Sequence, residues 1–224
     1  MTLHSKIAVS SSFIFLVAGA AAFFLFEYNN PLTMKDYSVG EKVMLSLFQS
    51  VTTRTAGFAT IPQQDLSNAS SMVALLLMFI GGSPTGTAGG VKTVTMAVLL
   101  GSAFASIKNE KDVSYFGRII PRETVSKAAA ITTISFLTMF FSTVLLSVVT
   151  DASALDVLYE TVSATATVGL TRNLTPFLNN YGKMIIIITM YLGRVGPISL
   201  AIAFRTKKEK QGSVNNPVEE IIVG

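Results

Sequence analysis

Two short segments of this chain share a threonine, one intervening residue, a glycine and an apolar residue, in that order. They read Thr55-Ala56-Gly57-Phe58 and Thr167-Val168-Gly169-Leu170. The chemistry open to such a segment is that of its backbone carbonyl oxygens, which can replace the hydration shell of a cation. Glycine suits this task because turning carbonyls toward one axis requires backbone angles that a side chain penalises. The two segments are therefore candidates for an ion filter.

Other side-chain chemistry is scarce in this sequence. The chain has no cysteine and a single histidine, His4, which excludes thiolate sites and leaves little room for histidine-based catalysis or metal binding. Charged residues make up 13% of the 224 residues, against about 25% in ordinary soluble domains. The mean hydropathy is +0.55. This composition predicts an integral membrane protein.

Long uncharged runs predict where the chain crosses the membrane. A hydrocarbon core of about 30 Å requires about 20 helical residues. Three runs have that length: Ile7 to Phe26, Ala128 to Thr150, and Met184 to Phe204, which Arg194 interrupts. A secretory signal peptide is the alternative for the first run, but phenylalanines occupy the place of its small-residue cleavage site. The predicted spans contain no Asp, Glu or His, so we expect no intramembrane enzyme.

A fourth membrane segment, residues 67–107, is too long and too rich in glycine for one continuous helix. Its middle reads Gly81-Gly82-Ser83-Pro84-Thr85-Gly86-Thr87-Ala88-Gly89-Gly90, a sequence that disfavours a helix. Irregular backbone at membrane depth needs protein or water around it, because lipid cannot satisfy its polar groups. We therefore predict a broken helix around a polar loop. Helix packing through Gly86 and Gly90 is the less favoured alternative, since Pro84 lies beside them.

Two further uncharged segments are too short to cross a membrane. Val43 to Thr53 and Thr161 to Thr171 have eleven residues each, carry several hydroxyl side chains and run toward or through one of the two glycines described above. An apolar helix of this length with a glycine-bearing end is typical of a re-entrant segment that enters and leaves on the same side. We predict that both are pore helices.

The order of span, short segment, glycine and span occurs twice, which indicates an internal duplication. The two glycines are 112 residues apart, and the same offset places Met78-Phe79-Ile80-Gly81 on Met190-Tyr191-Leu192-Gly193. Upstream, a one-residue shift pairs residues 47–51 with residues 158–162. A simple glycine turn is the alternative for either segment alone, but equivalent places in a repeat favour a filter.

Basic residues predict the orientation of the chain. Ten Lys and Arg lie on one side of the predicted spans, at the N-terminus and in residues 108–127 and 205–224, and five lie on the other side. By the positive-inside rule, both termini are cytoplasmic. The outer side also carries seven acids, and its net charge of −2 favours cations. Arg54, beside the first filter segment, would tune the field there or pair with one of these acids.

These motifs resemble those of a known family. Residues 50–58, followed by Gly81-Gly82-Ser83-Pro84 and Thr87-Ala88-Gly89-Gly90-Val91-Lys92, resemble the third repeat of the Trk/Ktr/HKT superfamily of potassium transporters. Thr167-Val168-Gly169-Leu170 with Gly193-Arg194-Val195-Gly196-Pro197 resembles the fourth repeat. The resemblance covers nearly the whole chain. Because the family carries four repeats in one chain, the resemblance implies that this chain is the C-terminal half.

The resemblance also implies roles for the predicted site. Gly57 and Gly169 would supply two of four filter glycines, and the backbone carbonyls of the eight filter residues would coordinate K⁺. A gate below the filter would be formed by Gly81, Gly82, Ser83, Pro84, Gly86, Thr87, Gly89, Gly90 and Lys92. Arg194 would face the pore beneath the filter, since a charge in lipid is costly. Two alternatives stay open: Arg194 as a structural clamp on helix ends, and Lys92 reaching the cytoplasmic interface.

The predicted fold is all-α and integral to the cell membrane, with two tandem repeats of span, re-entrant pore helix and span. These repeats form half of a four-repeat pore of the potassium-channel type. Residues 1–107 would be the first repeat, 108–127 a cytoplasmic linker, 128–204 the second repeat and 205–224 a cytoplasmic tail.

The expected function is potassium uptake by a chain that is part of a larger subunit. The resemblance implies a homodimer of membrane subunits and a cytoplasmic nucleotide-binding ring as partner. We expect membrane lipid around the chain, no nucleic-acid partner and no cofactor within it, because no dinucleotide-binding motif follows a soluble strand. Two alternatives are a non-conducting accessory subunit, since two filter segments cannot enclose a pore, and a homodimeric two-repeat channel.

Overall fold

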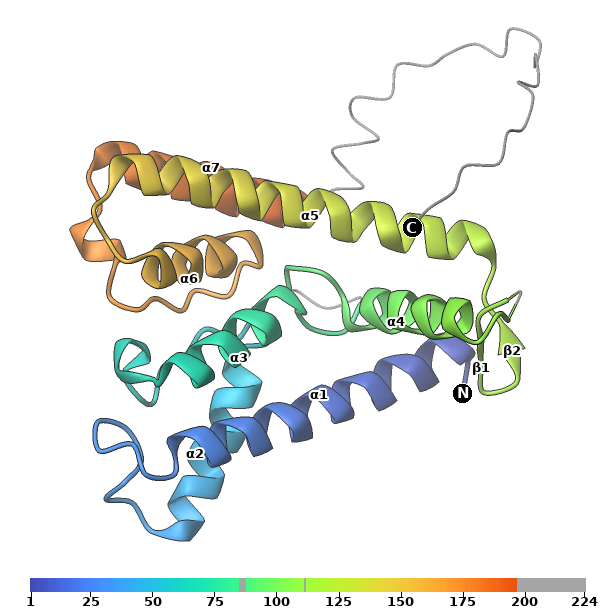
Figure 1. Ribbon diagram of the computed structural model, residues 1–224, viewed down its shortest axis with the longest axis horizontal. Helices are drawn as coiled ribbons and strands as arrows, with labels where there is room; N and C mark the ends of the chain where they lie inside the picture. The colour runs from blue at the N-terminus through green and yellow to red at the C-terminus, as the bar shows by residue number, and fades with distance from the viewer. Residues whose placement is uncertain (85–87, 111, 197–224) are drawn as a thin grey trace, which may run out of the picture.

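The computed structural model describes residues 1–84, 88–110 and 112–196, and within them the chain is mostly helical (Figure 1). The α-helices are α1 (Leu3–Glu27), α2 (Val39–Thr52), α3 (Asn68–Phe79), α4 (Thr93–Ile107), α5 (Arg122–Val149), α6 (Ala154–Thr165) and α7 (Asn180–Val195). Short 3₁₀ turns, η1 (Gln63–Asp65) and η2 (Thr175–Phe177), follow the two predicted filter segments.

One element departs from the all-α expectation. A small antiparallel hairpin, β1 (Ser114–Tyr115) and β2 (Arg118–Ile119), connects α4 to α5. Phe116 and Gly117 at its turn both have positive φ, 51° and 72°, which matches the turn of a two-residue hairpin. The hydroxyl of Tyr115 donates to the backbone of Ala97 in α4 at 2.8 Å. The hairpin is therefore fastened to the helix that precedes it.

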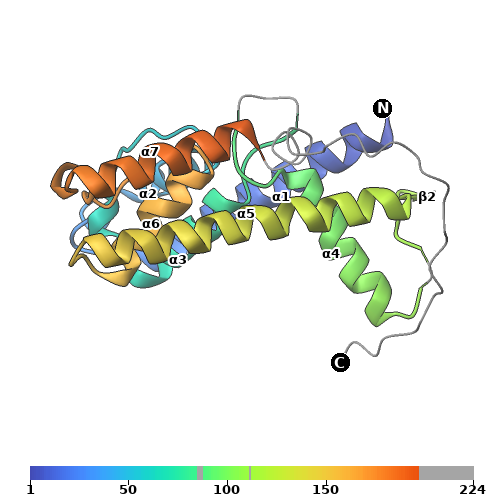
Figure 2. The ribbon, with the colours of Figure 1, turned by 90° about the horizontal axis from the view of Figure 1, so that it is seen from above.

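The helices form two groups that share one core. Helix α1 packs on α2, α3 and α4, while α5 packs on α6 and α7. Figures 1 and 2 both show α5 and α7 side by side, with α6 next to them. Helices α3 and α6 join the groups through a buried cluster that includes Phe23, Met78, Tyr159 and Val168. The core thus lies between the two repeats and directly beside the predicted filter.

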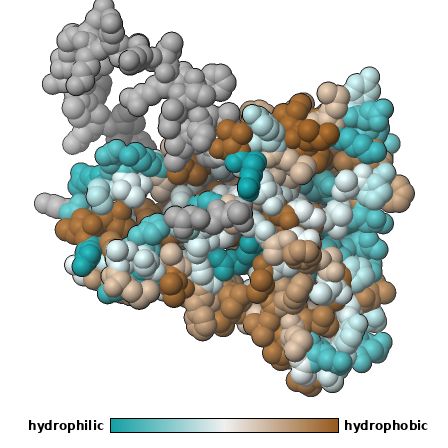
Figure 3. Space-filling model, turned by 180° about the vertical axis from the view of Figure 1, so that it is seen from behind, coloured by the Kyte–Doolittle hydropathy of each residue, from teal (hydrophilic) through white to brown (hydrophobic). Residues whose placement is uncertain are grey.

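Two helices among the described residues are long and apolar enough to cross a membrane, α1 with 25 residues and α5 with 28. Helices α3 and α4 are shorter apolar helices on either side of residues 80–92. Large apolar side chains on the long helices point outward; Phe13 is 65% exposed and Phe141 59%. Figure 3 shows hydrophobic residues gathered along the lower margin of one face and hydrophilic residues along its right-hand side. Such a surface suits a protein surrounded by lipid.

The last predicted span differs from the helix in the structure. Helix α7 begins at Asn180, four residues before the predicted start, because the side chain of Asn179 caps its first turn by accepting from the Gly182 N–H at 2.8 Å. It ends at Val195, because Gly196 takes a positive φ of 78°. Residues 197–204 of the predicted span lie outside the described residues.

Both short helices begin with a serine cap and an acidic third residue. Ser38 caps α2 and Ser153 caps α6, with Glu41 and Asp156 in the first turns. Each serine hydroxyl accepts from the backbone N–H of that acidic residue, and the negative charge lies at the positive end of the helix dipole. Hydrogen bonds from Ser38 also hold the pKa of the Glu41 carboxyl below its usual value. The same local chemistry therefore starts both helices.

Gly193 sets the closest approach between α7 and α6. A Cβ atom there would lie 2.1 Å from the backbone oxygen of Thr165, which cannot rotate away. We expect Gly193→Ala to destabilise the fold by about 1–3 kcal/mol, as overpacking does, and to lower the midpoint of thermal unfolding of the detergent-solubilised protein. Gly40→Ala is the control, because a Cβ at that helical position meets nothing within 4 Å. Equal midpoints for the two variants would contradict this packing.

Candidate functional site

Both predicted filter segments follow the C-terminal end of a short helix and adopt the same unusual backbone. Thr55 and Gly57 have φ of 70° and 78°, and Thr167 and Gly169 have φ of 54° and 95°, whereas Ala56 and Val168 between them are not in the positive region. A backbone in which residues with positive φ alternate with residues with negative φ can turn successive carbonyl groups toward one side. The chain therefore takes the conformation that a carbonyl-lined site requires at both places in the repeat.

The positive φ values of the two threonines are a feature that sequence reasoning missed. A β-branched residue rarely enters the left-handed region, which costs about 1–2 kcal/mol for an L-residue. Thr55 and Thr167 occupy equivalent positions in the two repeats, so the same strain is present twice. Strain that a structure holds at equivalent positions typically marks a functional segment.

The backbone N–H groups of the filter segments are taken up by the helices behind them. The carbonyl of Thr52 accepts from Ala56 and Gly57 at 3.1 and 3.2 Å, and the carbonyl of Ser163 accepts from Val168 at 2.9 Å. Thr52 and Ser163 are equivalent residues under the one-residue shift of the repeat. Because these donors are satisfied from behind, the carbonyls of the segments are left to another ligand.

The hydroxyl groups of the same two residues add a second attachment. The Ser163 hydroxyl accepts from the N–H of Gly169 at 3.1 Å. The Thr52 hydroxyl accepts from the N–H of Phe58 at 2.7 Å and donates to its carbonyl at 2.6 Å. The oxygen of Phe58 is therefore engaged with α2, unlike the oxygens expected to line a filter. Hydroxyls on the short helices thus fix both filter segments.

The two segments, although 112 residues apart in the chain, lie against each other. A Cβ on Gly57 would be 2.1 Å from the backbone oxygen of Val168. A Cβ on Gly169 would lie 4.0 Å from the Cα of Gly57. Glycine is required at position 57 for this approach as well as for its φ. The fold therefore brings the two predicted halves of the ion site together.

The predicted gate loop lies directly against the start of both segments. A Cβ on Gly82 would be 3.9 Å from the Thr55 hydroxyl oxygen, and one on Gly89 would be 2.2 Å from that of Thr167. The loop closes on itself, since the N–H of Val91 donates to Phe79 at 3.1 Å and Gly81 meets the backbone of Gly89. Of the predicted gate residues, Gly86 and Thr87 lie outside the described residues.

A cavity of about 270 Å³ lies between the loop, α5 and α7. The basic side chains of Lys92 and Arg194 both line it. Lys92 donates from Nζ to the backbone oxygen of Ala88 within the loop. Arg194, in the last turn of α7, lines the same cavity. Thr165, at the end of the second short helix, also lines the cavity. Two basic side chains thus line a cavity that reaches the end of α6, next to the second predicted filter segment.

Arg54 lies elsewhere than expected. Its guanidinium donates from Nη1 to the backbone oxygen of Ser12 at 2.9 Å, so it contacts the middle of α1 and pairs with no carboxylate among the described residues. The Ser12 hydroxyl also lies 2.7 Å from the hydroxyl of Ser83. Within the described residues, the expected ion pair of Arg54 with an acid is therefore absent, because the guanidinium is bonded to α1.

The hydroxyl of Thr52 offers a direct test of how the first segment is held. We expect Thr52→Val, which keeps the shape of the side chain, to lower stability by about 1 kcal/mol, because it removes the hydroxyl that bonds the partly buried N–H and C=O of Phe58. Thr132→Val in α5 is the matched control, since its buried hydroxyl has no partner in the part of the chain that the structure describes. Chemical unfolding in detergent measures both; equal losses would refute the assignment.

Comparison with known proteins identifies the family. A family described as "Cation transport protein", TrkH, matches residues 3–216. The Ktr system potassium uptake protein B of Bacillus subtilis (strain 168) is 34% identical over 223 residues, which are 100% of this chain and 50% of that protein. The potassium/sodium uptake protein NtpJ of Enterococcus hirae is 35% identical over an alignment of 237 positions, which covers 100% of this chain and 51% of that protein. The chain spans about half the length of these relatives.

A solved structure supports the same fold. The crystal structure of the potassium transporter TrkH from Vibrio parahaemolyticus superposes with a TM-score of 0.75 at 19% identity, over 89% of this chain and 44% of that chain. At this identity the likeness concerns the fold alone. Together with the family match over almost the whole described chain, these comparisons place the chain in the TrkH family of cation transport proteins, membrane transporters whose members include potassium uptake proteins.

Proposed function

We propose that this chain takes part in potassium uptake through a filter lined by the backbone carbonyls of its two Thr-x-Gly segments. The observation that carries the proposal is the shared backbone of these segments, in which Thr55, Gly57, Thr167 and Gly169 have positive φ. A dehydrated cation needs several oxygens at once, and a strained segment with its N–H groups bonded from behind supplies them without rearrangement. Potassium is the ion because related proteins are potassium uptake proteins.

The two segments supply two of the four that surround a potassium ion in known filters. We propose that the chain corresponds to the third and fourth repeats of the family, its C-terminal half, and that the other two segments come from further repeats of the same protein. A pair of two-repeat chains is the second way to reach four segments. The direct contact of Gly57 with the second segment is compatible with either arrangement, because both add the missing segments on the remaining side.

The gate in this proposal is the loop from Gly81 to Lys92. It lies against both threonines that begin the filter segments, and its glycines allow the backbone to approach them and to move away. Lys92 and Arg194 place two positive charges on the adjoining cavity, which oppose the passage of a cation while the loop is closed. Arg194 is thus a pore-facing group in this view rather than a structural clamp.

We further propose that the chain crosses the cell membrane several times with both termini in the cytoplasm, as its basic residues favour. In this arrangement the hairpin and residues 108–127 face the cytoplasm. They and residues 205–224 would meet a nucleotide-binding regulatory ring, and two membrane subunits would pair as a homodimer.

The filter assignment is tested at Gly169. A side chain there must adopt a φ of 95° at a cost of about 1–2 kcal/mol, so we expect Gly169→Ser to lower the preference for K⁺ over Na⁺ by about tenfold. The measurement is rubidium and sodium uptake by cells that lack their own potassium uptake. The cells express the natural gene product, either unchanged or with the substitution. Gly40→Ser on the exposed start of α2 is the control. An unchanged preference in Gly169→Ser would refute the filter.

The gate is tested at Lys92. Lys92→Met removes one of the two cavity charges and the bond that closes the loop onto Ala88. We expect potassium uptake to rise several-fold while the preference for K⁺ over Na⁺ stays the same, because the filter is untouched. Lys183→Met, at the far end of α7, provides a charge-matched control. Uptake that falls or stays constant in Lys92→Met would contradict a gating role for this charge.

A further inference from the structure

A buried glutamine after the first filter segment joins the two repeats. The Gln63 side chain, in η1, is 3% exposed. Its oxygen accepts from Gln49 Nε2 at 2.6 Å and from the Tyr159 hydroxyl at 3.0 Å. Its nitrogen donates to the backbone of Ile61 at 2.8 Å and to Gln49 Oε1 at 3.2 Å. The amide of Gln63 therefore has partners on both its oxygen and its nitrogen.

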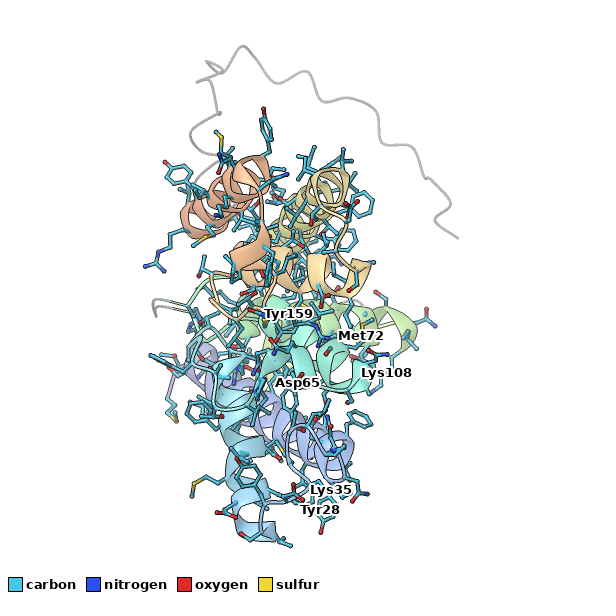
Figure 4. All side chains as sticks on the ribbon, turned by 90° about the vertical axis from the view of Figure 1, so that its left-hand side faces the viewer. Tyr28, Lys35, Asp65, Met72, Lys108 and Tyr159 are labelled. Atoms are coloured by element: carbon cyan, nitrogen blue, oxygen red, sulfur yellow. The ribbon has the colours of Figure 1, made fainter. Side chains whose placement is uncertain are left out.

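The partners of Gln63 belong to the two helices that carry the filter. Gln49 lies in α2, three residues before Thr52, and Tyr159 lies in α6, four residues before Ser163. Both Gln49 and Tyr159 are completely buried. Figure 4 shows Tyr159 between the group of α5 to α7 and the group of α1 to α4. One side chain thus links the two helices one turn away from the hydroxyls that hold the filter segments.

Arg172 makes a second link between the same parts of the molecule. It follows the second filter segment, and its side chain is 11% exposed. Its guanidinium donates to the backbone oxygens of Gln63 at 2.9 Å and Gln64 at 3.0 Å. Its Nε pairs with Asp156 at 2.7 Å, in the first turn of α6. The segment after the second filter therefore holds the segment after the first, and the backbone of Gln63 as well as its side chain is fixed by the other repeat.

We propose that Gln63 and Tyr159 are positioning residues for ion selection, because they set the distance between the two filter segments. This inference rests on the proposed filter function. Discrimination between K⁺ and Na⁺ depends on how many carbonyls surround the ion and how firmly they are spaced. Apolar contacts between α3 and α6 bring the repeats together, but they have little directional preference. Hydrogen bonds between buried groups are directional and therefore specify one position of α6 relative to α2.

Tyr159→Phe removes the hydroxyl bond between the repeats and nothing else. Gln63 keeps its donor from Gln49, so no buried oxygen is left without a partner. We expect the ratio of rubidium to sodium uptake to fall by about two- to tenfold, the range that corresponds to one net hydrogen bond, with the amount of protein in the membrane unchanged. Tyr181→Phe, at a 74% exposed tyrosine in α7, is the matched control and should leave the ratio unchanged. A second variant, Gln63→Leu, should lower the ratio further.

The outcomes separate this inference from the function on which it rests. If Gly169→Ser lowers the ratio and both Tyr159→Phe and Gln63→Leu leave it unchanged, the hydrogen bond between Gln63 and Tyr159 does not position the filter and the inference fails alone. If Gly169→Ser also has no effect, the filter itself is wrong. If Tyr159→Phe does not accumulate in the membrane, Gln63→Leu decides, and loss of both variants from the membrane overturns the proposal in favour of a folding role.

Discussion

The constraint on which this structure depends is that backbone polar groups inside a membrane must be satisfied by protein, while an ion filter requires that some carbonyls be left free. Under the proposed function, the molecule would meet both demands by using donors and acceptors separately. Oxygen atoms of Thr52 and Ser163 accept hydrogen bonds from N–H groups of the two predicted filter segments. The segments are therefore held by the short helices, and their carbonyl groups do not have to face lipid. A continuous helix could not do this, because each N–H would pair with a carbonyl of the same segment.

Close backbone approach is the second requirement, and it explains where glycines occur. The filter segments, the loop and the end of α7 all meet near one another, and each contact passes through a glycine whose Cβ would lie 2.1 to 2.2 Å from a neighbouring oxygen: Gly57, Gly81, Gly89 and Gly193. Gly81 and Gly193 are equivalent in the repeat, but one meets the loop and the other meets α6. These equivalent positions of the predicted repeat therefore both require a small residue, although their neighbours differ.

Sequence reasoning was most informative where a pattern is local. Uncharged runs anticipated α1 and α5, because the length of a span follows directly from the thickness of lipid, and the glycines after Phe79 coincide with the place where α3 ends. It could not anticipate the inward fold of Arg54 or the role of Gln63. Gln63 lies in a polar loop without periodicity, and its partner Tyr159 is 96 residues away, so only the packed fold brings them together. The last 28 residues, with their predicted tail, stay outside the described structure.

The residues that lie behind the two predicted filter segments differ in charge, because one repeat has an amide where the other has a carboxyl group. In the first repeat, Gln49 binds the neutral amide of Gln63. In the second, the equivalent Glu160 is a buried carboxylate that accepts from the hydroxyls of Thr171 and Thr175. The carboxyl group of Glu160 therefore shares a pocket with Gly169 in the second predicted filter segment, whereas the cationic residue Arg54 directly precedes the first. Coulomb interactions are weakly screened in a buried site, so under the proposed function the two segments would present unequal electrostatic surroundings to an ion.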